Sequence, residues 1–439
     1  MWWNDPSARA AFDTADRQRA QLEADGFAPA TVARIQRQKL AELWDRAAAV
    51  PYYRDLPGFA ARDLATLPVT GKDVVKARPM DFCPPGLTGT LKYYESSGST
   101  GNPTPTPRLA RDVIANVIGV SPLWRRLLGT EPAGIVSMLP SDVVPVGDFA
   151  AAACEYLGHQ LLRAYPFSTG MCDFDRLAAL FTGFRPRAVF AAPGVLSQWT
   201  RLLKTRGTLS DVRASVGTIL LLGEVCLAGQ RAKLARDWDA DVFDVSYGST
   251  ETGTIAAACE HGSMHLLEHG HIVEIRDSDG TVGPAAPGAG GELVTTTLNN
   301  VARPLLRYGT GDHVDVAAEP CRCGLPLPSI AVRGRATDQV SLHGQVLTEQ
   351  RVGTVVYDDH RLTGYLIQLR ADGGRGRLVL ERDVDVTDPD EDLITAAAKR
   401  FTEAGIDWDD IVVVHQLPAT SKSGGSQKNW KRTNLVTVS

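Results

Sequence analysis

The stretch Asp241-Val-Phe-Asp-Val-Ser-Tyr-Gly-Ser-Thr-Glu251 decides how the rest of the chain is interpreted. Phe243 and Val245 alternate with smaller or polar neighbours, a pattern typical of a buried strand. The residues that follow put an aromatic ring, two hydroxyls and a carboxylate on one loop: Tyr247, Gly248, Ser249, Thr250 and Glu251. Such a loop can stack a base, bind phosphate oxygens and hold a magnesium ion. A polar turn after a strand explains the same residues, so the choice depends on other parts of the chain.

Length and composition indicate a soluble globular protein. The 439 residues suggest two or three domains at ~150 residues each. The net charge of -5 gives no argument for nucleic-acid or membrane partners, and no apolar run approaches the ~20 residues that span a bilayer. The N-terminus lacks the features of a secretory signal, so we expect a cytoplasmic protein. The cysteines are odd in number and four are scattered, which argues against a disulfide framework: Cys83, Cys154, Cys172 and Cys226.

The segment 111–250 alternates between apolar runs and helical stretches. Four runs indicate strands: residues 134–139, 188–192, 218–222 and 242–245. This alternation predicts an α/β fold with a mostly parallel sheet that is covered on both faces. Ligands of open α/β sheets bind beyond the carboxyl ends of the strands. We therefore expect the site where these runs end in glycine, proline and polar residues.

The two ends of the chain differ in character. Residues 8–49 have a helical pattern and the segment 64–72 leads into another short helix; both indicate scaffolding without chemistry. The composition shifts at Arg333–Asp338, and a small α+β unit of about 100 residues follows, near the modal domain size. We therefore expect a large N-terminal domain over 1–336 and a small, mobile C-terminal lid domain over 337–439.

A second polar stretch, Tyr93 to Thr106, combines hydroxyl side chains with glycines. Glycine lets backbone N–H groups approach an anion closely, and hydroxyls add further donors to phosphate oxygens. The candidate phosphate-binding residues are Ser96, Ser97, Gly98, Ser99, Thr100 and Gly101. Asn102 follows where a Gly-x-x-x-x-Gly-Lys-Ser/Thr loop has its lysine, so the stretch is not that motif. A flexible serine/glycine linker has the same composition.

Four soft ligands lie in two pairs. Cys259 and His265 form Cys-x5-His, and Cys321 and Cys323 form Cys-x-Cys. Two such pairs can close a tetrahedral zinc site, and four protein ligands would make it structural. A free cysteine pair beside surface histidines is the alternative, with His261 as the competing ligand.

The segment 303–312 ends in Thr310-Gly311-Asp312, which presents a carboxylate on a tight turn. An ionised carboxylate accepts two hydrogen bonds at once and so suits the two hydroxyls of a ribose. The chain closes with a glycine/serine-rich stretch that carries cations, residues 421–432. A frayed basic tail is the usual explanation of such a stretch.

Together these motifs resemble those of the adenylate-forming ligases, most closely the phenylacetate–CoA ligase branch, and the match runs nearly the whole length. The matching stretches are Val50–Arg54, Leu67–Lys72, Ser96–Thr104, Tyr247–Glu251, Tyr308–Asp312, Gly334–Asp338 and the Cys/His set. The resemblance implies that ATP, magnesium, structural zinc and CoA are the cofactors. It also implies a first reaction step in which a carboxylic acid is adenylated, and a second in which the acyl group passes to CoA.

The resemblance also implies roles for single residues. Tyr247 would stack on adenine, with Gly223 and Glu224 around the base. Thr250 would contact phosphate, Glu251 would bind magnesium, Asp312 would hold the ribose, and Arg335 would act at the hinge to the lid. The acid pocket would draw on the loops 144–149 and 192–194, with Gly223 and Gly248. A lysine from the C-terminal loop would bridge the carboxylate and the α-phosphate.

Three departures from the family pattern affect these roles. Asn102 replaces the usual lysine of the phosphate loop, and Gly309 replaces a usual arginine. The C-terminal loop lacks the usual Gly-Lys pair, so an ungapped count puts Asn429 at the position of the catalytic lysine. Lys428 is then the candidate after a shift of one residue, and Lys431 is the fallback.

Three functions stay open at this point. The first is a ligase that joins a small, aromatic carboxylic acid to CoA. The second keeps adenylation but changes the acid or the acceptor: a carrier protein, an amine, or nitrite activated for attack by an arylamine. The third is an inactive nucleotide-binding homologue, against which the retained Thr250, Glu251 and Asp312 argue. The acid, the acceptor and the oligomeric state are undetermined, and a homodimer is compatible with the sequence.

Overall fold

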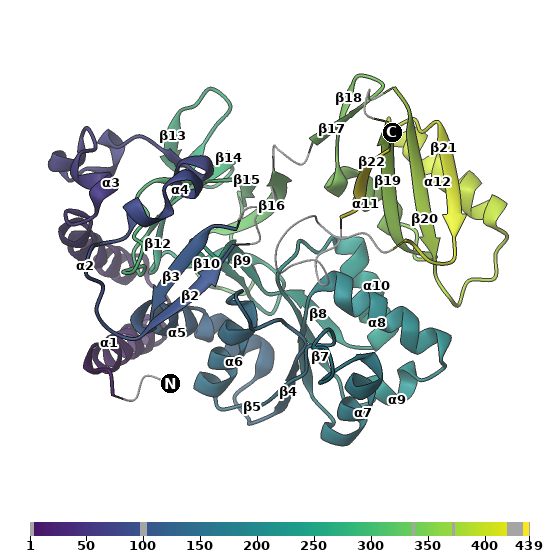
Figure 1. The fold of residues 1–439 in the computed structure, drawn as a ribbon, viewed down its shortest axis with the longest axis horizontal. Helices are drawn as coiled ribbons and strands as arrows, with labels where there is room; N and C mark the ends of the chain where they lie inside the picture. The colour runs from purple at the N-terminus through teal and green to yellow at the C-terminus, as the bar shows by residue number, and fades with distance from the viewer. Residues whose placement is uncertain (1–3, 97–102, 336–338, 371–373, 419–432, 439) are drawn as a thin grey trace.

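The computed structural model describes residues 4–96, 103–335, 339–370, 374–418 and 433–438 (Figure 1). A five-stranded sheet and a nine-stranded sheet form the large part of the molecule, with the N-terminal helices packed against them. A smaller α+β part follows at the C-terminal end. No helix in the described ranges has the length and apolarity needed to cross a membrane.

The five-stranded sheet is parallel throughout, as the alternating pattern predicts. Its order is β5 (Gln160–Arg163), β4 (Gly134–Ser137), β6 (Ala188–Ala191), β7 (Thr218–Leu221) and β8 (Asp241–Asp244). Its helices are α5 (Ala110–Leu128), α6 (Val146–Leu157), α7 (Phe174–Phe184), α8 (Pro193–Thr205), α9 (Leu209–Arg213) and α10 (Ala228–Trp238). Successive strand residues enter two different cores: Val189 packs with Trp199 and Trp238, whereas Phe190 packs with Trp124. Helices on both faces therefore explain why these strands are apolar throughout.

The nine-stranded sheet is antiparallel except at one pairing. Its path is β13 (Val282–Pro284), β12 (His271–Arg276), β14 (Gly290–Thr297), β15 (Tyr308–Val316), β16 (Ser329–Arg335), β11 (Met264–Leu266), β10 (Gly253–Ala258) and β9 (Ser246–Ser249). The short β1 (Thr70–Gly71) pairs in parallel with β15. The prediction of a loop directly after Val245 is therefore partly wrong, because Ser246–Ser249 is a strand and the turn begins at Thr250.

The N-terminal segment forms two long helices where the pattern indicated one continuous helical region. These are α1 (Pro6–Ala24) and α2 (Pro29–Ala47), and they are separated by Gly26 and Phe27, which both have positive φ. The smaller elements that follow are α3 (Pro51–Arg54), η1 (Phe59–Ala61), η2 (Leu64–Thr66), α4 (Lys72–Ala77), η3 (Pro79–Phe82), β2 (Leu91–Glu95) and β3 (Pro105–Leu109). The last two pair as a hairpin that flanks the polar stretch after Glu95.

The C-terminal part has its own core. Its elements are β17 (Gln339–Leu342), β18 (Gln345–Thr348), α11 (Glu349–Tyr357), β19 (Leu362–Arg370), β20 (Gly376–Arg382), α12 (Asp390–Glu403), β21 (Asp410–Val414) and β22 (Leu435–Val438). The four-stranded order is β21-β20-β19-β22, and Leu380, Ala397 and Phe401 are buried together. The division at 336/337 falls among residues outside the described ranges and stays a prediction.

Candidate functional site

A pocket lies where β9, β15 and the start of α4 meet. Its lining consists of Lys72, Tyr247, Gly248, Ser249, Thr252, Ile255, Tyr308, Thr310 and Asp312. The pairing of Thr70 with Tyr308 and of Gly71 with Gly309 carries Lys72 to this pocket from far along the chain. The segment expected to be scaffolding therefore supplies a cation, which the sequence reasoning missed. The signal available in the sequence was a lysine directly after Thr70-Gly71, where the chain begins a helix.

Tyr247 and Asp312 face each other across the pocket. The Tyr247 hydroxyl donates to Asp312 Oδ2 at 3.0 Å, and the backbone N–H of Asp312 donates to Thr310 Oγ1 at 3.1 Å. The backbone approaches closely at Gly248, where a Cβ would lie 2.1 Å from the carbonyl oxygen of Gly253. This position therefore accepts only glycine, because a side chain would collide with backbone atoms.

The glycine at 309 also has a steric explanation. A Cβ there would lie 2.8 Å from Glu292 Oε1 and 3.1 Å from Val69 Cγ1. A larger residue here would need the flexible end of Glu292 to move aside and Val69 to shift slightly. Lys72 is the cation among the lining residues of the pocket.

Glu251 is a buried carboxylate that stays charged. Its side chain is 3% exposed, and Oε1 has no hydrogen-bond partner among the described residues. Burial alone would raise the pKa of this carboxyl, but the charges of Lys72 and Arg303 outweigh burial and lower the pKa. A buried, ionised oxygen without a protein donor is a suitable ligand for a hard divalent cation such as magnesium.

The turn that carries Glu251 is held by neighbouring polar side chains. Arg108 Nη2 donates to the carbonyls of Thr250 and Glu251, both at 2.8 Å, and Asn300 Nδ2 donates to the Glu251 carbonyl at 3.2 Å. Thr250 is thus positioned through its backbone, and its side chain is not part of the pocket lining. Arg108 and Asn300 were not found from the sequence, because neither belongs to a recognisable motif.

Arg303 links this turn to the hairpin of the polar stretch. It is fully buried, and its guanidinium donates to the Pro105 carbonyl at 2.5 Å and to Thr106 Oγ1 at 2.9 Å. The signal in the sequence was a charged residue directly before the apolar run Pro304–Leu306. A buried arginine needs partners of this kind, so its position should have indicated a structural or catalytic role.

The phosphate-loop candidates fall mostly outside the described residues. This holds for Ser97, Gly98, Ser99, Thr100 and Gly101, and also for the lysine candidate Lys428. Ser96 is described and buried: its N–H donates to the Thr104 carbonyl at 3.1 Å, and its Oγ accepts from the Thr104 N–H at 3.2 Å. These two bonds close the base of the polar stretch.

The remaining candidates lie at strand ends. Gly223 has a φ of 92° and follows β7, and Glu224 Oε2 accepts from the Gly194 N–H at 3.3 Å. This contact joins the loop expected around the base to the loop 192–194 expected around the acid. Neither Gly223 nor Glu224 lines the pocket. Arg335 is the last residue of β16 and pairs through its backbone with Asp312 on β15.

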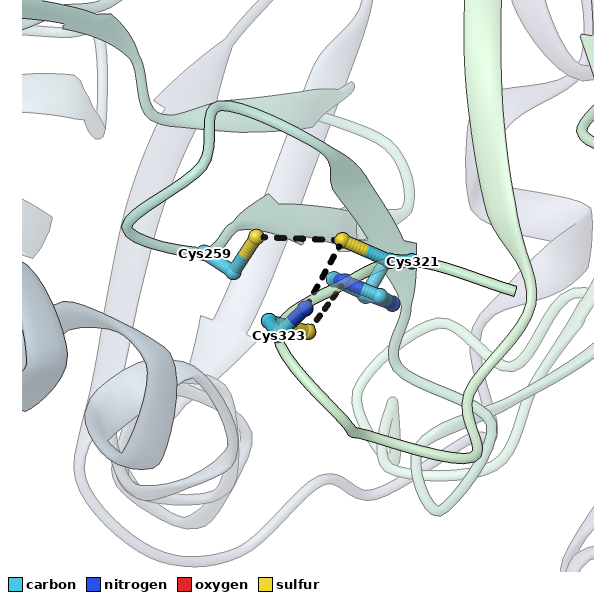
Figure 2. A group of neighbouring side chains, drawn as sticks. Cys259, Cys321 and Cys323 are labelled. Carbon is cyan, nitrogen blue, oxygen red and sulfur yellow. Dashed lines mark hydrogen bonds between the residues drawn. The ribbon is translucent and has the colours of Figure 1, made fainter. Parts of the chain in front are cut away.

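The four candidate zinc ligands converge, and Figure 2 labels the three cysteines among them. The ligand atoms of Cys259, His265, Cys321 and Cys323 all lie within 4.8 Å of one another. Cys259 Sγ is 3.8 Å from Cys321 Sγ, and Cys323 Sγ is 3.2 Å from His265 Nε2. The Leu327 carbonyl lies 2.9 Å from His265 Nδ1, which leaves Nε2 directed at the thiols. His261, the competing ligand, is outside this group and donates its backbone N–H to Cys259 Sγ at 3.4 Å.

Sheet pairing brings these ligands together from distant segments. Cys259 directly follows β10, and His265 on β11 is opposite Ala257 on β10. His265 also pairs with Ser329 at the start of β16, and the loop before β16 carries both remaining cysteines. Three thiols and one imidazole at this spacing match the preference of zinc for four soft ligands.

Comparisons with known proteins agree with the resemblance drawn from the motifs. No family model matches the chain. The chain is 27% identical over 364 residues to a phenylacetate–coenzyme A ligase of Thermus thermophilus, covering 77% of this chain and 78% of the relative. It is 25% identical over 323 residues to the phenylacetate–coenzyme A ligase of Escherichia coli, covering 71% and 70%. The resemblance to this branch is therefore confirmed.

Solved structures support the same fold. A 2-hydroxyisobutyryl-CoA ligase in its postadenylation state superposes with a TM-score of 0.79 at 17% identity, covering 94% of this chain and 90% of that one. The same ligase in its thioesterification state gives a TM-score of 0.64, covering 93% and 90%. The anthranilate CoA ligase AuaEII gives 0.56 at 16% identity, covering 76% and 66%. The α/β fold with a C-terminal domain is confirmed.

Proposed function

We propose that this protein is an ATP-dependent acid–CoA ligase that adenylates a small, aromatic carboxylic acid and then transfers the acyl group to CoA. One observation carries the proposal: Glu251, a buried and ionised carboxylate, lies beside a pocket that joins Tyr247, Asp312 and Lys72. The similarity to phenylacetate–coenzyme A ligases and the fold shared with an anthranilate CoA ligase support the aromatic class of acid.

The pocket suits the nucleoside part of ATP. The ring of Tyr247 offers a face on which adenine can stack. Asp312 accepts from the Tyr247 hydroxyl, and an ionised carboxylate has the acceptor capacity to bind a ribose hydroxyl as well. In this proposal one hydrogen bond fixes the ring and the carboxylate relative to each other before the nucleotide binds.

The phosphates would lie toward Lys72 and Glu251. Magnesium held by Glu251 Oε1 would neutralise phosphate charge when bound. In the first step a carboxylate oxygen of the acid bonds to the α-phosphorus, and the bond to the pyrophosphate oxygen breaks. Lys72 stabilises the negative charge of the reacting phosphate. Cations at positions 102 and 309 would share this role, but this chain has Asn102 and Gly309 there. In the second step the CoA sulfur attacks the acyl carbon, and AMP leaves.

Further site roles belong to the same proposal. Ser96, Ser97, Gly98, Ser99, Thr100 and Gly101 bind phosphate, Gly223, Glu224 and Gly248 border the bound acyl-adenylate, and Thr250 contacts phosphate. Lys428 bridges the acid and the α-phosphate, and Arg335 acts where the large domain (1–336) joins the lid (337–439). The cytoplasmic location and the homodimer remain predictions from the sequence.

We also propose a structural zinc ion held by Cys259, His265, Cys321 and Cys323. The convergence of the four ligand atoms supports it, and so does the backbone carbonyl that orients His265. All four positions are taken by protein ligands, so the ion would have no open position for catalysis. Its role would be to tie the loop before β16 to the end of β10.

The test is ATP–pyrophosphate exchange with a panel of benzoates, aminobenzoates, arylacetates, cinnamates, fatty acids and nitrite. Exchange with an aryl acid, followed by CoA-dependent release of AMP, is the expected result. Exchange with nitrite alone would favour activation of nitrite for attack by an arylamine. Exchange with an acid but no reaction with CoA would favour a carrier protein or an amine as acceptor. ATP binding without any exchange would favour the hypothesis of an inactive nucleotide-binding homologue.

A further inference from the structure

A cluster of buried charges joins the C-terminal part of the chain to the helices of the parallel sheet. Lys204 lies on α8, Lys233 and Asp237 lie on α10, and Asp383 follows β20. Lys204 Nζ is 2.8 Å from Asp237 Oδ1 and 2.9 Å from Asp383 Oδ2, and Lys233 Nζ is ion-paired with the same Asp383 oxygen. Figure 1 shows α8 and α10 beside the end of β20. Two lysines of the large part thus share Asp383 of the small part, and Lys204 also pairs at 3.0 Å with the exposed Asp385.

The charges in this cluster are shielded from water. The side chains of Lys204 and Asp383 are 8% and 5% exposed. Burial disfavours the charge on Lys204, but the hydrogen bonds that Lys204 donates to Asp237 and Asp383 outweigh burial and raise the pKa of Lys204. Burial likewise opposes the charge of Asp383, yet hydrogen bonds from both lysines lower its pKa. Lys204 and Asp383 therefore stay ionised, and their attraction acts at low effective dielectric.

The same cluster allows the two parts to separate without leaving a buried charge unpaired. Asp237 belongs to α10 and contacts both lysines, Lys233 at 3.4 Å. When Asp383 and Asp385 leave, each lysine keeps Asp237 as a carboxylate partner and gains water. Separation is therefore less costly than breaking an isolated buried pair, which leaves an unpaired charge behind. The arrangement suits a contact that forms and breaks in each cycle.

A second contact beside the cluster depends on glycine. Gly229, in the first turn of α10, packs against the backbone of Tyr357 at the end of α11. A Cβ at 229 would lie 2.5 Å from the Tyr357 carbonyl oxygen and 2.8 Å from its carbonyl carbon. Because backbone atoms cannot move aside as a flexible side chain can, even alanine would push α11 away from α10.

The observed arrangement resembles one state of a related fold. The TM-score is 0.79 against the postadenylation state of the 2-hydroxyisobutyryl-CoA ligase and 0.64 against its thioesterification state, although both cover nearly the same share of the chain. The two states belong to one protein, so the difference reflects how the parts are arranged. The contacts at Asp383 and Gly229 are therefore those of an arrangement close to the postadenylation state.

We propose that these contacts form a docking latch: Lys204, Lys233, Asp237 and Asp383 together with the Gly229–Tyr357 contact. The latch positions the C-terminal lid for the adenylation step and is released before the acyl group is transferred. This inference rests on the proposed function, because only a two-step ligase needs one lid arrangement for each step. The four charged residues are positioning residues, since they lie apart from the lining of the nucleotide pocket.

Two variants break the latch in different ways. Asp383→Asn removes the shared charge and keeps the shape of the side chain. Gly229→Ala raises the helix propensity of α10 while it introduces the clash with Tyr357, so it does not weaken the large part itself. The matched control is Asp410→Asn, which breaks an exposed pair with Arg377 inside the C-terminal part.

The experiment measures each half-reaction separately. ATP–pyrophosphate exchange reports adenylation, and single-turnover transfer from preformed acyl-adenylate to CoA reports the second step. We expect both latch variants to lose about tenfold or more in exchange while transfer stays equal or becomes faster, and the control to match the wild type in both. Equal losses in both half-reactions, or wild-type exchange in both variants, would overturn the latch.

Hydrogen exchange of the free protein separates this inference from the proposed function. Amides of α10 and α11 should exchange faster in both latch variants than in the control, whatever the substrate. A wild type that shows no ATP–pyrophosphate exchange with any acid would defeat the proposed function. Unchanged hydrogen exchange in both variants would defeat the docking contact on its own.

Discussion

Replacement of Lys72 by methionine tests the most specific claim about the pocket. Methionine keeps an unbranched side chain of similar length and removes the charge. Lys72 is the only cation among the nine lining residues, and its charge is one of those that lower the pKa of Glu251. The charge therefore acts inside the site, where charge develops on the phosphate during adenylation.

The expected loss follows from this position. Removal of one preorganised group that stabilises transition-state charge lowers kcat by about 100-fold to 1,000-fold, or ~3–4 kcal/mol. Binding of ATP should weaken less than this, because the ground-state phosphates retain magnesium and the other donors. The assay is ATP–pyrophosphate exchange with the best acid of the panel, together with ATP titration by calorimetry.

A matched control separates the site from the helix. Lys76→Met removes a cation one turn later on α4, outside the pocket lining, and should leave exchange near the wild-type rate. Lys76→Met should unfold at the same temperature as the wild type. The reasoning fails if Lys72→Met exchanges within about threefold of the wild type, since a charge in contact with the reacting phosphate contributes more than that.

Three other expectations concern the same molecule. Asp312→Ala should weaken ATP binding about 10-fold to 100-fold by loss of charged hydrogen bonds, measured by calorimetry; unchanged affinity would remove Asp312 from the ribose site. Metal analysis should find about one zinc per chain, and a chelator or Cys321→Ser should lower the unfolding temperature, whereas metal-free protein of unchanged stability would contradict a structural ion. Burial lowers the pKa of His269 and of His271 to about 3, and the nearby charge of Lys39 is the second cause for His269. The unfolded chain takes up these protons below about pH 6.5 and the folded chain does not, so the unfolding free energy should fall by ~2 kcal/mol per histidine between pH 6.5 and 5. Denaturant titrations at several pH values should show this slope, and His271→Gln should reduce it; a flat profile would refute buried neutral rings.

Sequence analysis predicted the helices and strands whose residues show a clear hydrophobic periodicity. Apolar runs separated by helical stretches predicted the parallel sheet, because a strand that is buried on both faces has no polar face to show. The C-terminal strands near 365–369 and 377–381 and the helix from 390 to 404 were also predicted within a few residues. The strands β17, β18 and β22 were missed, since short strands at an edge or in a hairpin carry little periodicity.

The motif residues Tyr247, Asp312 and the four zinc-ligand candidates were recognisable from residue type and spacing. The turns expected at Tyr247 and Asp312 were wrong, because these residues lie in strands β9 and β15. What brings them together is not local. The parallel pairing of β1 with β15 carries Lys72 to Asp312, and sheet register places His265 opposite the end of β10. Arg303 reaches Glu251 through the packing of a loop.

The contact between the two parts of the chain could not be inferred from sequence at all. Lys233 and Asp383 are ordinary charged residues in ordinary surroundings, and either would be expected on a solvated surface. They are buried only because one helix of the large part meets the end of one strand of the small part. Local sequence thus determined which elements form and which residues carry chemistry, because periodicity and residue type act over a few neighbours. Tertiary structure decided which charges meet, because that depends on strand register and on the docking of separate layers.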